Sequence, residues 1–332
     1  MPPVPSMTAL SPVWAVEGGR VAIFGDRLLS SPDSVPAVRV GEIDARVVRA
    51  SASQIDILIP GGVEGRQPVR LADVPGAAAF VEIGAPIATG VHLVDNPVFD
   101  RRGALYATFS GTRSQRSAVT IYRLPADRAR EPLVSAIAHP TSLAVGPDGA
   151  LYATDRFESA LYRVDMDGHV ETVATDLGAP CGIAFAPDGA LYIGDRSGPI
   201  LRLDSSGVRT TVATLPASVA AFHLAWGPDD HLYAAAPTLG TSDRVYRVSP
   251  DGEVEPLPPS FGRPQGIAFD RHGRLYVSEA LAGASGVYRV SLADYAVEKV
   301  VAAPGVIGLA FDPSGGLVVA SSGVLHRLAV AV

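Results

Sequence analysis

The residues in this sequence that are best suited to chemistry are a histidine, an aspartate and a cysteine, each next to a β-rich segment. An imidazole can accept and release a proton in the physiological pH range, so His223 is a candidate general base. Asp95 is a second candidate for chemistry because it carries a carboxylate, and the thiol of Cys181 would be a nucleophile if a base such as His223 lowered its pKa. We take His223 and Asp95 as candidate catalytic residues. Together with Gln265 they are also the candidate ligands of one divalent cation, Ca²⁺ or Zn²⁺.

Each of these residues also has a purely structural interpretation. The side chain of His223 could simply fill space, because related positions of the sequence hold Gly or Ser. An aspartate before Asn96 and Pro97 often only shapes a turn. Cys181 is the single cysteine, so the chain has no internal disulfide, and a small buried side chain is its ordinary role. Both interpretations remain open for His223 and Asp95.

A sequence repeat determines where these residues lie. An apolar segment, a turn with Gly or Asp, and a second strand that begins with leucine recur at intervals of about 40 residues. The leucines that mark the six copies are Leu105, Leu151, Leu191, Leu232, Leu275 and Leu317. Five copies have glycine two residues before this leucine, and the fourth copy has Asp230 there. A tight hairpin turn often needs a positive φ at this place, which glycine adopts most easily.

Each copy continues with an alternating third strand that carries one arginine, expected to be structural because it lies far from the ring axis. These arginines are Arg123, Arg163, Arg202, Arg247, Arg289 and Arg327. A four-stranded sheet of this length cannot bury both faces alone, so the copies must stack into a closed ring. The last copy has only three strands, and residues 85–90 resemble the fourth strand of the second copy. We therefore expect an all-β fold in which residues 85–332 form a six-bladed β-propeller of four-stranded blades, with residues 85–90 closing the last blade.

The N-terminal segment, residues 8–84, does not share the repeat. It alternates apolar and polar residues in short runs, for example Val38 and Val40, then Ile55, Ile57 and Ile59. Short alternating strands with turns between them predict an immunoglobulin-like β-sandwich as a separate domain.

The direction of the strands brings the candidate residues to one face of the ring. Residues just before each innermost strand and just after each second strand share this face, here called the top face. The candidate ligand-binding residues on it are Asn96, Thr141, Ser142, Cys181, Phe222, Gln265, Asp155, Arg156, Asp195, Arg196 and Glu279. The two Asp-Arg pairs among them could bind an anionic ligand. Alternatively each aspartate bonds turn backbone and each arginine spans to the next blade.

Two family resemblances follow from these patterns. Residues Gly19–Gly25, Val38–Gly41 and Ser51–Pro60 resemble an IPT/TIG domain, which implies an immunoglobulin-like accessory module. The phrase Gly-Ile-Ala-Phe, Pro-Asp-Gly, Leu-Tyr resembles the six-bladed SMP-30/gluconolactonase and NHL-repeat group. That resemblance implies one divalent cation on the top face, with Asp95 and Gln265 at carboxylate places and Thr141 and Cys181 at amide places. Only Asp95 matches the ligand type that the family uses.

Composition limits the possible functions. The net charge of −7 and the absence of a basic cluster exclude a nucleic-acid surface, and no apolar run is long enough for a membrane helix. No basic and apolar leader segment is visible, which favours the cytoplasm, although a mature secreted chain would look the same. We expect a recognition protein that binds a small molecule, sugar or peptide at the top-face mouth of the channel, with a possible protein contact through the N-terminal sandwich. The alternative is a divalent-metal-dependent hydrolase acting on a lactone or ester; whether the chain is an enzyme stays open.

Overall fold

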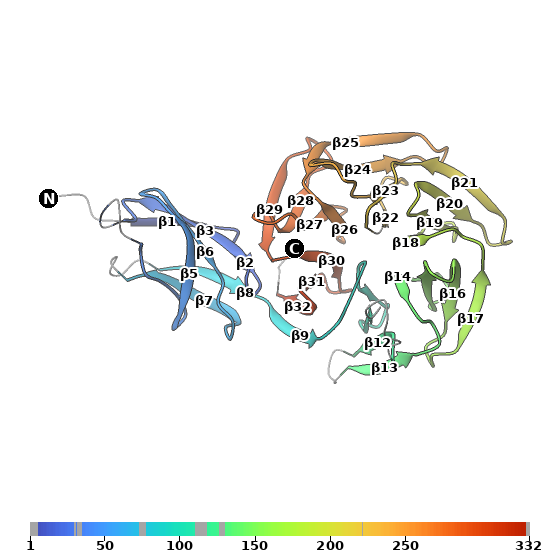
Figure 1. The fold of residues 1–332 in the computed structure, drawn as a ribbon, viewed down its shortest axis with the longest axis horizontal. Helices are drawn as coiled ribbons and strands as arrows, with labels where there is room; N and C mark the ends of the chain where they lie inside the picture. The colour runs from blue at the N-terminus through green and yellow to red at the C-terminus, as the bar shows by residue number, and fades with distance from the viewer. Residues whose placement is uncertain are drawn as a thin grey trace.

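The computed structural model describes residues 6–29, 31, 35–72, 78–109, 118–125, 130–220 and 222–329. Within these ranges the regular secondary structure is β-strand throughout. No helix long and apolar enough to cross a membrane occurs among the described residues. Figure 1 shows a ring of small sheets with the N-terminal strands at one side of it.

Five separate four-stranded antiparallel sheets form most of the ring. The first sheet contains β10(Val98–Phe99), β11(Leu105–Thr108), β12(Ile121–Leu124) and β13(Glu131–Val134). The second contains β14(Pro140–Val145), β15(Leu151–Asp155), β16(Ala160–Val164) and β17(Val170–Ala174). The third contains β18(Pro180–Phe185), β19(Leu191–Asp195), β20(Pro199–Leu203) and β21(Arg209–Thr214). The fourth sheet contains β22(His223–Trp226), β23(Leu232–Ala235), β24(Asp243–Val248) and β25(Val254–Phe261). The fifth contains β30(Val306–Phe311), β31(Leu317–Ser321) and β32(Val324–Leu328), and its outer strand is β9(Ala85–Thr89).

The strands β26(Pro264–Phe269), β27(Leu275–Glu279), β28(Gly286–Val290) and β29(Val297–Ala302) do not form a separate sheet. They end a 12-stranded sheet that continues into the N-terminal part in the order β1-β3-β6-β5-β4-β7-β8-β2-β29-β28-β27-β26. The N-terminal strands are β1(Ser6–Ser11), β2(Trp14–Ala15), β3(Arg20–Asp26), β4(Val38–Val40), β5(Ile43–Ala50), β6(Gln54–Leu58), β7(Gly65–Leu71) and β8(Ala78–Ile83).

The junction is the short strand β2, which lies between β8 and β29 and runs parallel to both. Trp14 pairs with Val301 on one side and with Glu82 on the other. The prediction of six separate four-stranded blades, and that of a separate immunoglobulin-like sandwich, are therefore wrong: five blades stand alone, and the N-terminal strands share a sheet with β26–β29. The sequence pattern shows which strands alternate, but not which strand occupies the outer edge of β29.

The side chains at this junction are interlocked as well. Ala302 of β29 belongs to the apolar core of the N-terminal strands, which Val21, Ile23 and Ile57 help to form. In return, Val16 from the N-terminal part is fully buried in the core between β28 and β32. Burial of apolar surface in both directions stabilises the contact between the two parts.

The closing strand lies where the sequence predicts it. β9 pairs antiparallel with β32, with Thr89 opposite Val324 and Ala85 opposite Arg327. The chain enters β9 through Gly84, and a Cβ at this position would lie 3.0 Å from Leu328 Cγ. Glycine therefore lets β8 run directly into β9 beside β32, as Figure 1 shows.

The hairpin turns also follow the predicted pattern. Gly149 and Gly189 have φ values of 80° and 86°, and Asp230 takes a φ of 57° at the corresponding place in the fourth copy. These turns hold the first and second strands of each copy together at the end opposite to the top face.

Candidate functional site

Three buried polar side chains meet at the axis of the ring on the top face. His223 Nδ1 lies 2.6 Å from Asp95 Oδ1, and His223 Nε2 lies 3.1 Å from Gln265 Oε1. The exposed fractions are 0% for His223, 5% for Asp95 and 7% for Gln265. His223 begins β22, Gln265 lies in β26 and Asp95 lies in the segment before β10, so this cluster joins side chains that are far apart in the sequence.

The protonation of His223 follows from its partners. In the tautomer with a hydrogen on Nδ1, the Nδ1–H group donates a hydrogen bond to the Asp95 carboxylate, which accepts it. Nε2 can then accept a hydrogen bond from the Gln265 amide group in one orientation of that amide, or donate to its oxygen when the imidazole is charged. In both arrangements Asp95 fixes the orientation of the ring.

Close packing of the inner strands brings His223 to this place. His223 is the first residue of β22, and Phe222 before it is fully buried. A Cβ at Gly182 would lie 2.2 Å from the Phe222 carbonyl oxygen, and one at Gly194 would lie 2.8 Å from Phe222 Cβ. The two glycines therefore allow β18, β19 and the chain entering β22 to approach one another.

Asn96 lies beside this cluster but is engaged with the backbone of two other strands. Its Nδ2 donates to the Ile267 carbonyl at 2.8 Å, and its Oδ1 accepts from the Leu309 amide at 3.0 Å. A Cβ at Gly266 would lie 2.1 Å from Asn96 Oδ1, so the glycine leaves room for this bridge. Asn96 therefore ties the start of β10 to β26 and β30.

Ser142 and Thr141 are buried at the start of β14, and Ser142 takes part in a similar bridge. The Ser142 amide donates to Thr154 Oγ1, whose hydroxyl donates to the Cys181 carbonyl at 2.7 Å. Ser142 Oγ in turn accepts from the Ile183 amide. The sequence analysis did not select Thr154 as a site residue. The only indication in the sequence was its position near the end of a second strand, β15.

The three carboxylates at the ends of second strands bind backbone amides. Asp155 accepts from His139, Phe157 and Glu158, and Asp195 accepts from Ala179 and Ser197. Glu279 accepts from Gly262, Arg263 and Leu281. These contacts match the structural interpretation of the carboxylates, because each one links the chain entering an inner strand to the chain leaving a second strand.

The two arginines that follow these aspartates differ from each other. Arg196 donates to the Ser218 and Val219 carbonyls at 3.2 and 2.8 Å and thereby spans to the next sheet. Arg156 is half-buried, its guanidinium carbon lies 5.0 Å from the centre of the Phe157 ring, and it has no carboxylate partner among the described residues. Arg156 therefore remains available to an anionic ligand on this face.

Cys181 is fully buried near the axis. Burial raises the pKa of its thiol to about 11, and the charge of Asp95 acts in the same direction, while the charges of Arg156 and Arg196 oppose it. A thiol with such a pKa is protonated at neutral pH, which does not fit a cysteine nucleophile.

The cluster does not fit the divalent cation that the SMP-30 resemblance implies. It offers one carboxylate, one imidazole and one amide, and Asp95 Oδ1 already accepts from the Asn96 amide at 2.7 Å as well as from His223. Ca²⁺ prefers six or more oxygen ligands, including several carboxylates. In the described part of the chain, no group of three or more His, Cys, Asp or Glu residues is placed to hold a metal ion.

Comparison with known families shows to which propeller family the chain belongs, which the repeat alone did not decide. The sequence profile of the virginiamycin B lyase family matches residues 103–311, which is more than half of the chain. The chain belongs to the virginiamycin B lyase family. The assignment to the SMP-30 and NHL-repeat group is thereby corrected, and an IPT/TIG domain is not shown. The shared phrase is common to related propellers and does not separate these families.

Solved structures of related fold support the propeller architecture. A catalytically inactive virginiamycin B lyase from Staphylococcus aureus with quinupristin is 18% identical, with a TM-score of 0.54 and coverage of 91% of this chain and 97% of that chain. A gluconolactonase from Xanthomonas campestris is 16% identical, with a TM-score of 0.60 and coverage of 90% and 98%. An auxiliary nutrient binding protein from Bacteroides ovatus is 12% identical, with a TM-score of 0.58 and coverage of 99% and 98%. No curated protein matches the sequence.

Proposed function

We propose that this protein binds a small molecule with an anionic or carbonyl group at the top-face mouth of the ring. The observation that carries the proposal is the buried contact of His223 with both Asp95 and Gln265 at the axis. Polar side chains that converge on one point in a ring of apolar strands are typical of a ligand site. Arg156 adds a cation without a described carboxylate partner on the same face.

The family favours a second candidate, lyase chemistry with His223 as the general base. An imidazole held by a carboxylate at 2.6 Å is oriented for proton transfer. In an elimination, Nε2 would take a proton from carbon, a carbon–carbon double bond would form, and the bond from the adjacent carbon to oxygen would break, with the electron pair leaving on that oxygen. Gln265 would have to give up its contact with Nε2 before a substrate could approach.

A binding experiment tests the first candidate. Isothermal titration with quinupristin, sugar lactones and sugar acids should identify a ligand for the wild-type protein. Replacement Arg156→Gln should weaken the binding about tenfold, because a charge-assisted hydrogen bond is lost. Arg244→Gln, on the exposed surface of β24, is the matched control and should leave the affinity unchanged. Equal affinity of the Arg156→Gln and wild-type proteins would contradict the proposed placement.

Mass spectrometry distinguishes the second candidate from hydrolysis. Opening of a cyclic ester by elimination leaves the mass of the substrate unchanged, whereas hydrolysis adds one water. We expect an unchanged mass and a loss of turnover of at least about a hundredfold in His223→Gln, the usual size of a general-base contribution. Full turnover in His223→Gln, or a product heavier by one water, would exclude this mechanism.

A further inference from the structure

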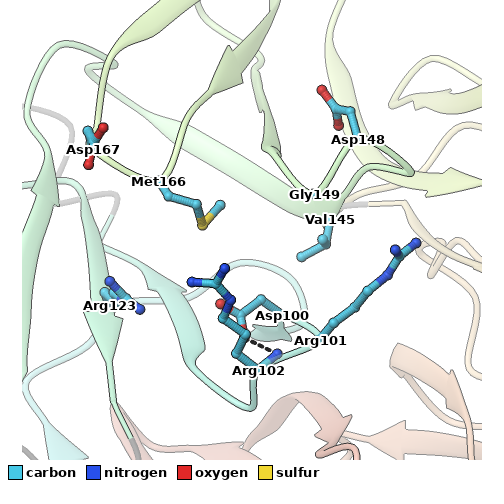
Figure 2. A pocket seen from close by; sticks show the side chains of 9 residues that line it. All are labelled: Asp100, Arg101, Arg102, Arg123, Val145, Asp148, Gly149, Met166 and Asp167. Atoms are coloured by element: carbon cyan, nitrogen blue, oxygen red, sulfur yellow. Dashed lines mark hydrogen bonds between the residues drawn. The ribbon is translucent and has the colours of Figure 1, made fainter.

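A cavity of about 500 Å³ opens at the end of the ring opposite to the top face. It lies between the first two sheets, at the turns that join β10 to β11, β14 to β15 and β16 to β17 (Figure 2). Its lining includes three arginines, Arg101, Arg102 and Arg123, together with Met166. Nothing in the proposed function uses this end of the ring.

The arginines of the third strands explain why this place is unusual. In the second, third and fourth copies of the repeat, this arginine forms an ion pair with an aspartate in the turn between the first two strands. The pairs are Arg163–Asp148 at 2.7 Å, Arg202–Asp188 at 3.0 Å and Arg247–Asp229 at 2.7 Å. The aspartate always stands three residues before the leucine that begins the second strand.

The first copy reverses the charge at this position. Arg102 stands three residues before Leu105, so the carboxylate that would pair with Arg123 is replaced by a second cation. The Nε atom of Arg123 is buried and has no hydrogen-bond partner. Glu131 lies opposite Arg123 in the strand register, yet no ion pair joins these two side chains. A buried donor without a partner is costly and indicates a missing acceptor.

The carboxylates of the cavity are committed elsewhere or lie at its rim. Asp100 accepts from the Arg102 and Ala104 amides and from the Tyr106 hydroxyl. Asp148 is held by Arg163 in the ion pair described above. Asp167 is exposed to solvent. None of the three forms an ion pair with Arg102 or Arg123.

Figure 2 shows how the side chains are arranged around this space. The guanidinium of Arg102 points toward Met166, Arg123 approaches from the neighbouring strand, and Arg101 extends toward the other side of the turn. Guanidinium groups bind the oxygens of a phosphoryl group through several directed hydrogen bonds. Met166 offers an adaptable apolar surface to the rest of a ligand.

We propose that this cavity binds a tetrahedral oxyanion, a phosphoryl or sulfuryl group, between Arg102 and Arg123. The oxyanion supplies the acceptor that Arg123 lacks and separates two like charges. Arg101 contributes a third positive charge at the rim. The volume leaves room for a small organic molecule attached to the anion.

Isothermal titration with inorganic phosphate at constant ionic strength tests this site, with sulfate and acetate titrated in parallel. We expect saturable binding of phosphate or sulfate to the wild-type protein. The decisive variant is Arg102→Asp, which introduces the aspartate found in the second, third and fourth copies and should pair with Arg123. It should fold with at least the wild-type melting temperature, and it should bind phosphate at least about tenfold more weakly.

Two controls separate this site from general charge and from the top face. Arg46→Asp makes the same charge change on the exposed strand β5 and should retain the wild-type affinity for phosphate. His223→Gln should retain it too, because the top-face cluster lies at the other end of the ring. Absence of saturable phosphate and sulfate binding, binding of acetate alone, or equal affinity in Arg102→Asp would each overturn the proposal.

Discussion

Asp155, Asp195 and Glu279 stand at equivalent places in the repeat and have one role in common. Each uses its carboxylate to hold backbone amides of the chain that enters an inner strand. Asp95 differs because its carboxylate also contacts the imidazole of a residue from another sheet. At the level of single residues, this contact is what distinguishes a candidate functional carboxylate from a structural one.

Cys181 gives a direct test of burial near the axis. Because the pKa of its thiol is raised to about 11, we expect no reaction with a thiol reagent such as DTNB at pH 7.5 in the folded protein. One equivalent should react after unfolding in guanidinium chloride, since the chain has a single cysteine. Rapid reaction of the native protein would show that the channel is open at this depth.

The sequence indicated which residues share a face of the ring, but not which contacts they make. Strand direction placed His223, Asp95 and Gln265 on one face, and they do meet there. The roles of Asn96 and Thr154 as bridges between strands could not be predicted, because hydrogen bonds between distant segments leave no periodic signal in the sequence. The sequence shows an arginine at position 102, but its importance is clear only from the structure, in which Arg123 Nε has no hydrogen-bond partner.

At the scale of elements, the spacing of the inner strands depends on glycines. Gly182 has room only for hydrogen, because a Cβ there would lie 2.2 Å from the Phe222 carbonyl oxygen. Replacement Gly182→Ala would push β18 away from the chain that enters β22 and displace His223.

We expect Gly182→Ala to lower the free energy of unfolding by about 2 kcal/mol, a typical cost of overpacking a well-filled interior. Urea unfolding followed by fluorescence measures this change. Gly61→Ala is a useful comparison, since its Cβ would meet only the end of the flexible Glu17 side chain, which can move. Equal loss of stability in both variants would contradict the role assigned to Gly182.

The strand order of the ring was predictable from its repeat, whereas the junction with the N-terminal part was not. The similarity of residues 85–90 to an outer strand was enough to predict that β9 completes the sheet of β32. β2 is only two residues long and pairs in parallel on both sides, so it has neither the length nor the alternation that identifies a strand. The continuous 12-stranded sheet therefore appears only in three dimensions.

At the scale of the whole molecule, Lys299 lies at the junction between the two parts. The chain contains no other lysine. The pKa of this ammonium is lowered from 10.5 to about 8, chiefly by burial and in part by the charge of Arg20 on β3, while the carboxylates of Asp56 and Glu279 oppose the shift. The folded state therefore disfavours the charged lysine, whereas the unfolded chain keeps it protonated up to higher pH.

This shift predicts how stability depends on pH. Between about pH 8 and 10.5 the unfolded state binds more protons at Lys299, so the contribution of this residue to stability rises with pH. Between pH 7.5 and 9.5, the stability of the wild-type protein relative to Lys299→Met should increase by about 2 kcal/mol. Urea unfolding of both proteins at the two pH values measures the difference, in which titration of the tyrosines cancels. A constant difference would mean that Lys299 is solvated in the folded protein.

The two strand pairs β2–β29 and β9–β32 also have a consequence for how the chain folds during synthesis. In each pair, the first strand is synthesised early, and its partner, β29 or β32, leaves the ribosome only near the end of translation. The four sheets made entirely of consecutive strands, from β10–β13 to β22–β25, can form as they emerge, but the ring and the 12-stranded sheet cannot be completed until the last copies are made. Until then β2 and β9 each expose an unpaired strand edge, so the nascent chain would depend on chaperones more than its many short-range hairpins suggest.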